Sequence, residues 1–245
     1  MICAARTYPC FLLAVLVLAP IARAVEPRAT SSVRPQQGEI ALFDGTSLSG
    51  WTAAGGEPST RGWLVENGAL VRTERSGAIY ADNPFEDFEL EFEWKLAKGG
   101  NSGVKYRVRH YQKGVWGRPG WLGCEYQLYD DTRAPRPVSS TGALYALYAP
   151  NDKKKLNPPG AYNHSRIVVK GSRIEHWLNG DKIIEADTSS AEWRQRIAKS
   201  KFARVEGFAQ NRKGLIQIQD HGSKVWFRKL LLRSTNPTLD AERED

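Results

Sequence analysis

The stretch DFELEFEWKL, residues 87–96, alternates between large apolar and charged side chains from its second residue onward. In an extended chain, successive side chains point to opposite faces. One face of this stretch would therefore carry four large apolar side chains, those of Phe88, Leu90, Phe92 and Trp94. A period of two is typical of a strand with one face in the core and one in water. The stretch predicts a half-buried β-strand.

Short strands separated by tight-turn residues account for most of the remaining pattern. Residues 63–72 predict two strands around Asn67-Gly68, a dipeptide that favours a type I′ hairpin. Residues 166–187 predict three strands that turn at Gly171-Ser172 and again at Asn179-Gly180. Four further strands are expected at 103–110, 124–130, 142–148 and 225–233.

A single short, peripheral helix is expected. Ser189 and Glu192 fit a capping box, and Trp193 and Ile197 are one helical turn apart. Many short strands with almost no helix indicate an all-β fold, either a β-sandwich, a jelly roll or a barrel. About 200 residues in one such domain is ordinary.

The N-terminal residues have the features of an export signal. The apolar run at 10–20 is too short to span a bilayer comfortably, and Ala22 and Ala24 form an A-x-A cleavage pattern. The alternative is an uncleaved membrane anchor. No later segment is long and apolar enough for stable membrane insertion. We expect a periplasmic or secreted protein with a signal peptide (1–24), a flexible lead-in (25–38), one domain (39–234) and a polar tail (235–245).

The cysteine content bears on the disulfides to be expected, and the charge content bears on the binding partners. Cleavage would leave Cys124 as the only thiol, so no internal disulfide is expected and Cys124 is predicted to be a small buried hydrophobe. The formal charge is +8, yet the one basic run is Lys153–Lys155, in a loop rich in Pro, Asn and Gly. Such runs are usually solvated, and export argues further against a nucleic-acid partner.

Six motifs occur in a fixed order along the chain: LFDGTSLSGW (42–51), GGNSGVKYR (99–107), EYQLYDD (125–131), TGALYALYAP (141–150), PPGAYNHSRIVVKGSRIEHWLNG (158–180) and IQDHGSKVWFRKLLLR (218–233). Together they resemble the 3-keto-disaccharide hydrolase family, formerly known as a domain of unknown function. The resemblance implies a concanavalin A-like lectin/glucanase jelly roll, a sandwich of two antiparallel sheets with the site on the concave one. It also implies an exported protein that acts on sugars oxidised at C3.

The chain departs from the family pattern at three places. Ala161-Tyr162 stands after PPG, where Glu-Trp is common, and Lys105 stands where the family usually has an apolar or aromatic residue. Gln217 stands where Gly is common. These differences bear on the substrate more than on the fold.

A 3-keto sugar has its own chemical requirements. The ketone acidifies the proton on C2, so that a base can form an enolate, the C1 substituent can leave by β-elimination and water can add back. Such a site needs a base near C2, a cation, metal or hydrogen-bond donor near the C3 oxygen, and an acid for the leaving oxygen. It does not need the two flanking carboxylates of ordinary glycosidases.

Three residues are the predicted catalytic groups. His221 is the first candidate base, because imidazole titrates near neutral pH. Glu125 is the second, as an acid or base, and Arg107 is expected to bind the ketone or enolate oxygen. The alternatives are a turn histidine, an exposed strand glutamate and a surface ion pair. Strand alternation places these residues in polar rows backed by apolar rows.

Further residues are expected to bind the sugar. The polar rows that contain the catalytic candidates also include Asn101, Lys105, Gln127 and Gln219. The motif TGALY would place Tyr145 near the cleft as a hydrogen-bond donor. The Gly-rich loop at 111–123 contains Trp116 and Trp121, whose rings either pack on sugar faces or fix the loop to the core.

A divalent metal ion is the one cofactor that the sequence leaves open. No metal-binding sequence motif occurs, so such a site would be assembled from distant residues, with Glu125, Asp220 and His221 as ligands. An equally good interpretation of Asp220 is a turn residue that accepts backbone N–H bonds. His176 shares a face with apolar neighbours and is expected to pack in the core.

Two rival functions remain open at this level. A non-catalytic carbohydrate-binding module would use the same amides and aromatic rings, although it has little use for a titrating pair such as His221 and Glu125. A retaining β-glucanase would use alternating carboxylates, as at Glu89, Glu91 and Glu93. For these glutamates a solvated outer face is the favoured interpretation.

Overall fold

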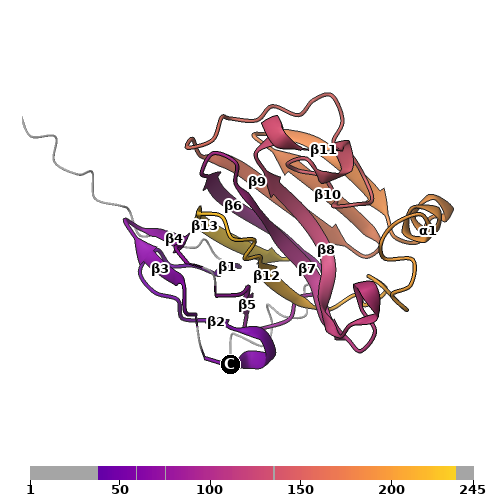
Figure 1. Ribbon diagram of the computed structural model, residues 1–245, viewed down its shortest axis with the longest axis horizontal. Helices are drawn as coiled ribbons and strands as arrows, with labels where there is room; N and C mark the ends of the chain where they lie inside the picture. Colours follow the sequence, from indigo (N-terminus) through magenta and orange to yellow (C-terminus); the bar gives the residue numbers. More distant parts are fainter. Residues whose placement is uncertain (1–37, 59, 75, 135, 236–245) are drawn as a thin grey trace, which may run out of the picture.

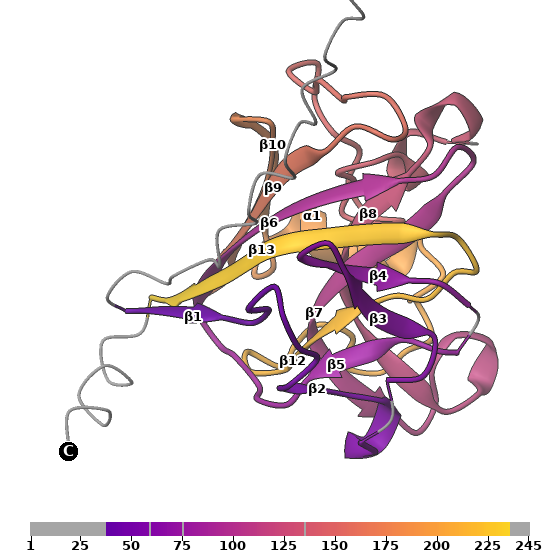
Figure 2. The same cartoon turned by 90° about the vertical axis from the view of Figure 1, so that its left-hand side faces the viewer.

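The computed structural model describes residues 38–235 except 59, 75 and 135. Its strands form two antiparallel sheets packed as a sandwich (Figures 1 and 2). The larger sheet has the order β11 (Asp181–Asp187), β10 (Arg173–Leu178), β9 (Asn163–Lys170), β6 (Phe88–Leu96), β13 (Val225–Ser234), β4 (Ala69–Arg72) and β3 (Trp63–Glu66), with β1 (Glu39–Ala41) also paired to β13. The smaller sheet has the order β2 (Trp51–Thr52), β5 (Ile79–Ala81), β12 (Leu215–Ile218), β7 (Asn101–Tyr111) and β8 (Gly120–Tyr129). The predicted all-β jelly-roll sandwich is confirmed.

Helical segments are few and peripheral. The one α-helix among the described residues, α1 (Ala191–Ala198), lies at the edge of the sandwich (Figure 1). Short 3₁₀ turns occur in the connections: η1 (Ala54–Gly56), η2 (Val115–Gly117), η3 (Asp131–Arg133) and η4 (Pro137–Ser139). No helix in the described part of the chain is long and apolar enough to cross a bilayer.

The alternation in β6 divides the core from the surface as expected. Its four large apolar side chains, Phe88, Leu90, Phe92 and Trp94, are at most 2% exposed. The ring of Phe92 packs edge-on against Tyr126 of the smaller sheet, with 5.7 Å between centroids. Burial of each such side chain stabilises the fold by about 2–3 kcal/mol. The two sheets are therefore joined through the face that the sequence pattern indicated.

The glutamates of β6 lie on the outer face of the larger sheet. Glu89 pairs with Arg166 at 2.7 Å, and Glu91 lies 3.2 Å from His164. Glu93 pairs with Arg228 and Lys229, each at 2.5 Å. All three carboxylates thus have partners across neighbouring strands, on the side away from the smaller sheet. The outer-face interpretation is confirmed, and a glucanase arrangement on this strand has no structural support.

Local turn chemistry explains the predicted hairpins. Asn67 and Gly68 have φ angles of 51° and 72°, the left-handed pair that a type I′ turn requires. Asn179 and Gly180 repeat this at 48° and 93° between β10 and β11. Asparagine and glycine adopt this region at low cost, so both hairpins are fixed by their own dipeptides.

Two local predictions were wrong. Residues 142–148 do not form a strand: Leu144 makes isolated bridges to Tyr126 and Tyr148, and Ala146 has a φ of 64°. Ala146 lies in a tight turn that returns Tyr148 to Leu144, so this segment forms isolated bridges and no continuous ladder. Helix α1 is capped by Ser190, whose hydroxyl accepts from Trp193 N, whereas Ser189 bonds to Asp187. The cap therefore lies one residue later than the sequence pattern suggested.

Predictions were also made for the two termini and for Cys124. The predicted signal peptide at 1–24, nearly all of the lead-in and nearly all of the tail lie outside the described residues. Cys124 is a buried free thiol, as predicted. Burial raises the pKa of this thiol to about 12, while the nearby Arg107 opposes the shift. Cys124 therefore behaves as a core hydrophobe.

Candidate functional site

The outer face of the smaller sheet carries a row of polar side chains across its strands. Tyr80 pairs with Gln217, Gln217 with Lys105, and Lys105 with Glu125. Residues at paired positions point to the same face, so these four side chains lie on one side of the sheet. The neighbouring row, made of Ile79, Ile218, Val104 and Tyr126, is buried in the core. The predicted polar row backed by an apolar row is present.

A cavity of about 280 Å³ opens beside this row. It brings together six of the predicted site residues: Asn101, Glu125, Gln127, Tyr145, Gln219 and His221. Four further residues line it that were not singled out as candidates from the sequence: Tyr129, Arg136, Ser139 and Lys201. Strands β7 and β8 supply the floor, and three connecting segments supply the remaining side chains.

Glu125 is the carboxylate of this cavity. It is 7% exposed, and its Oε2 lies 3.8 Å from Nζ of Lys105. Its side chain lies over Gly103 on the adjacent strand, where an added Cβ would be 2.7 Å from Oε1. Glycine at 103 therefore leaves the space that the carboxylate occupies. A mostly buried anion held beside a lysine can accept hydrogen bonds from a sugar or take part in proton transfer.

Lys201 and Tyr145 form a second charged part of the cavity. The ammonium of Lys201 lies 4.2 Å from the centre of the Tyr145 ring. Burial lowers the pKa of Lys201, and the charge of Glu125 opposes this shift. Burial also raises the pKa of Tyr145, with Glu125 adding to the effect. The cavity thus holds a cation and a neutral phenol close to a carboxylate.

Amide side chains provide hydrogen-bonding capacity on the cavity floor. Gln127 donates from Nε2 to Oδ1 of Asn101 at 3.0 Å, which orients both amides. The Oε1 atoms of Gln127 and Gln219 are buried without a hydrogen-bond partner among the described residues. Buried acceptors are normally satisfied, so these oxygens are suited to ligand hydroxyl groups.

Asp220 and His221 have different surroundings although they are adjacent. His221 is exposed and lines the cavity beyond the end of β12. Asp220 accepts from the backbone N–H groups of Ser76 and Gly77 at 2.8 and 2.9 Å, and lies 2.7 Å from Nε of Arg72. Burial opposes ionisation of Asp220, but these N–H groups and Arg72 keep its pKa below the ordinary value. Asp220 is a turn residue and does not orient His221.

The three proposed metal ligands do not gather. Asp220 is directed away from the cavity that Glu125 and His221 line. No group of three or more His, Cys, Asp or Glu side chains suited to a metal ion occurs in the described part of the chain. The metal set of Glu125, Asp220 and His221 is therefore not supported by the geometry.

Arg107 was expected beside Glu125, and this expectation was wrong. The register of β7 against β8 shifts between Tyr106 and Arg109, and Arg107 has a φ of 52°. This bulge interrupts the alternation on which the expectation rested. The guanidinium instead donates to Gly171 O at 2.5 Å and lines a separate cavity. Arg107 is thus not among the groups that surround Glu125.

The two loop tryptophans also lie outside the cavity. Trp116, in η2, is 86% exposed. Trp121 packs at 5.5 Å from the ring of Tyr80 and 5.4 Å from that of His110. Trp121 therefore contacts the polar row through the ring of Tyr80, whereas the exposed ring of Trp116 can contact other molecules. His176 is a core residue as predicted, bonded to Tyr106 and Gly142, and burial lowers its pKa to about 4.

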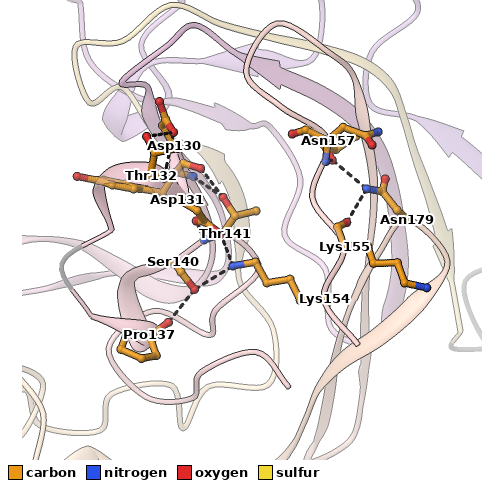
Figure 3. Close-up of polar contacts among 12 residues, drawn as sticks. Asp130, Asp131, Thr132, Pro137, Ser140, Thr141, Lys154, Lys155, Asn157 and Asn179 are labelled. Carbon is orange, nitrogen blue, oxygen red and sulfur yellow. Dashed lines mark hydrogen bonds and ion pairs between the residues drawn. The ribbon is translucent and has the colours of Figure 1, made fainter. Parts of the chain in front are cut away.

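A polar network fixes the loop that carries Arg136 and Ser139 (Figure 3). Lys154 lies 2.5 Å from Oδ2 of Asp131 and donates to Ser140 at 3.0 Å. Asp131 also accepts from Thr141 N at 2.7 Å. The loop from 131 to 141 is thereby tied to the segment around 154. Lys154 is the middle residue of the basic run 153–155 and is not the solvated side chain that was expected.

Comparison with known protein families identifies a match that spans the site. The model of one family, described as the 3-keto-α-glucoside-1,2-lyase-like domain, matches residues 38–233. That range includes every described residue of the cavity. The chain belongs to this family.

Proteins similar to this chain have names that refer to sugar hydrolysis. This chain is 28% identical over 227 residues to a 3-keto-disaccharide hydrolase of Bacteroides thetaiotaomicron, and the match covers 80% of this chain and 78% of that protein. A crystal structure from Parabacteroides distasonis, provisionally named a glycosyl hydrolase, superposes with a TM-score of 0.73 at 31% identity over 82% of this chain and 95% of that one. A second protein of that organism, with the same provisional name, gives 0.62 at 25% identity over 80% and 98%. These likenesses support a glycoside hydrolase-like function.

Residues missed from the sequence come from segments without periodic patterns. Lys201 follows α1 and Arg136 precedes η4, so neither belongs to a strand whose alternation could assign it to a face. Only the tertiary fold brings these cations into the cavity that Glu125 lines. Tyr129 is different: it shares the alternation of Glu125 and Gln127, and that signal would have identified it.

Proposed function

We propose that this protein cleaves 3-keto-glycosides by abstraction of the C2 proton, β-elimination of the C1 substituent and hydration of the product. One observation carries the proposal: Glu125, His221 and Lys201 face one cavity whose floor is lined with amides. Amides alone would suit a sugar-binding module. An imidazole and a mostly buried carboxylate suit proton transfer, and the ammonium of Lys201 in the same cavity suits the oxygen of a ketone.

Elimination is the first half of the proposed reaction. His221 removes the proton from C2, and the electron pair moves toward the C3 oxygen as an enolate. The ammonium of Lys201 and the hydroxyl of Tyr145 stabilise that oxygen, because opposite charge and hydrogen bonds favour the charge that develops there. The C1–O bond then breaks, and the leaving oxygen takes the proton from His221. The product is a sugar with a C1=C2 double bond conjugated to the ketone.

Hydration is the second half. Glu125 accepts a proton from a water molecule whose oxygen adds to C1, and the proton returns at C2. The sum of both halves is hydrolysis of the glycosidic bond, which agrees with a family described as lyase-like and a relative named a hydrolase. Asn101, Gln127 and Gln219 hold the remaining hydroxyl groups, and the ammonium of Lys105, 3.8 Å from Oε2, positions the carboxylate of Glu125.

Turnover assays test this proposal. The protein is incubated with methyl 3-keto-α-glucoside and with unoxidised methyl α-glucoside, and released methanol is measured. Cleavage of the keto substrate alone is expected. His221→Ala and Glu125→Gln should each abolish most of it, and Glu89→Gln on the outer face of the other sheet is the matched control. Binding of the keto sugar without any cleavage would instead favour a carbohydrate-binding module.

We also propose that the protein is exported. The support is the sequence pattern of residues 1–24, with its short apolar run and A-x-A site. N-terminal sequencing of the protein from its native cells should find Val25 as the first residue. A chain that retains Met1 or begins well after Val25 would contradict a signal peptide of this length.

A further inference from the structure

A second cavity, larger than the first, is lined by Arg107 and by residues of α1. Its volume is about 570 Å³. Its wall comes from α1, from the segment that follows α1 and from the turn between β9 and β10, at one end of the sandwich (Figure 1). Neither Glu125 nor His221 lines it. The groups proposed for catalysis therefore leave it unused.

The charge of this cavity is one-sided. Arg107, Arg194 and Arg212 line it, and none of the described lining residues is acidic. Arg212 is neutralised, because it pairs with Glu86 at 3.0 Å and with Asp87 at 3.5 Å. Arg107 and Arg194 have no ion-pair partner among the described residues. The cavity thus presents two uncompensated guanidinium groups.

Arg107 is the more unusual of the two. It is 2% exposed, and its Nε is buried without a hydrogen-bond partner among the described residues. Its guanidinium donates a hydrogen bond to a neutral acceptor, Gly171 O. A buried cation is costly unless it is paired with an anion. The arrangement has a place for a negative charge that the described residues do not supply.

The backbone around Arg107 is built to hold this position. Its φ of 52° lies in the left-handed region, which is uncommon for a residue with a long side chain. Asn211 donates to Arg107 O at 3.0 Å. Gly214 approaches so closely that a Cβ there would be 2.5 Å from the carbonyl carbon of Arg107. Strain of this kind persists where the surrounding structure imposes it, and it is concentrated at functional sites.

We propose that this cavity binds a small organic anion whose carboxylate or phosphate group pairs with Arg107 and Arg194. A guanidinium presents a planar fork of donors that matches a carboxylate or a phosphate. The remaining wall is largely apolar and includes Trp193, Ile197 and Phe208. A carboxylate with a compact apolar body therefore fits this cavity better than inorganic phosphate does.

Calorimetric titration tests the proposal with three probes. Benzoate has the charged head and the apolar body, benzyl alcohol has the same body without the charge, and inorganic phosphate has the charge without the body. We expect benzoate to bind at least about tenfold more tightly than either of the others, a difference of one decade in Kd. Equal binding of benzoate and benzyl alcohol, or no binding of any probe, would overturn the anion site. Tighter binding of phosphate than of benzoate would overturn the organic ligand.

Variants locate the binding. Arg107→Gln should remove benzoate binding, and its fold is checked by thermal unfolding because the side chain is buried. Arg194 is exposed, so Arg194→Gln tests the same cavity without that risk. Arg204→Gln is its matched control, because Arg204 is also exposed, lies in the segment after α1 and does not line the cavity. Ala198→Phe should fill the cavity and block the probe. Unchanged affinity in both Arg194→Gln and Ala198→Phe would show that the probe binds elsewhere and would overturn the proposal.

Discussion

Replacement of Gly103 by alanine tests the position of Glu125 without changing any charged group. The new Cβ would lie 2.7 Å from Oε1 and 3.1 Å from Cγ of Glu125. To reach the ordinary separation of 3.4 Å, the carboxylate end must move by about 0.7 Å. Gly103 is not among the residues with positive φ, so alanine fits the backbone there.

The size of the effect follows from what has to move. The carboxylate is the far end of a flexible side chain, so the free energy of unfolding should fall by only about 1 kcal/mol, at the low end for overpacking. A catalytic group displaced by close to 1 Å can lose ~100-fold in rate. We therefore expect kcat/KM on methyl 3-keto-α-glucoside to fall by ~100-fold while the protein stays folded.

Gly120→Ala is the matched control for this experiment. Gly120 lies on β8, the same strand as Glu125, and a Cβ there meets nothing within 4 Å. Kinetics and urea unfolding are measured for both variants. If Gly103→Ala retains the activity of Gly120→Ala, the reasoning that places Glu125 at the reacting centre is refuted.

Three further predictions concern the fold and the loop above the site. Ser190→Ala removes the cap that accepts from Trp193 N and should lower the free energy of unfolding by about 1 kcal/mol in urea titrations; no change would mean that the cap is dispensable. His176 has a pKa of about 4 in the fold against an ordinary 6.5, so the unfolded chain binds more protons in between, and stability should fall by about 3 kcal/mol as pH drops from 6.5 to 4. A His176→Gln variant whose stability falls as steeply over that range would assign the dependence to other groups. Lys154→Met removes the 2.5 Å pair with Asp131 and should cost about 1 kcal/mol of stability and raise KM severalfold; an unchanged KM would separate this loop from substrate binding.

The fold was predictable because the alternation of apolar and polar residues shows which face of a strand is buried. β6 alternates without interruption, and the type I′ dipeptides Asn67-Gly68 and Asn179-Gly180 stand where the hairpins turn. The same logic placed Glu125 and Gln127 on the outer face of the smaller sheet. Periodicity of two is a local property, and local properties can be inferred from one sequence.

The site was less predictable where the backbone leaves regular geometry. A bulge after Tyr106 turns Arg107 away from Lys105, and nothing in the letters VKYR marks that bulge. Lys201 and Arg136 reach the cavity from connecting segments, whose path depends on long-range packing such as the Lys154–Asp131 pair. Side chains on loops are positioned by tertiary contacts, so their place in a site follows from the structure and not from spacing.

The central claim is that cleavage begins with loss of the C2 proton. The most direct measurement uses methyl 3-keto-α-glucoside with deuterium at C2, in ordinary water, and follows both the rate and the fate of the label. The account predicts slower turnover than with the unlabelled substrate and a released 3-keto sugar that has lost deuterium from C2. Cleavage at an equal rate with the label fully retained would contradict elimination and point to direct displacement at C1.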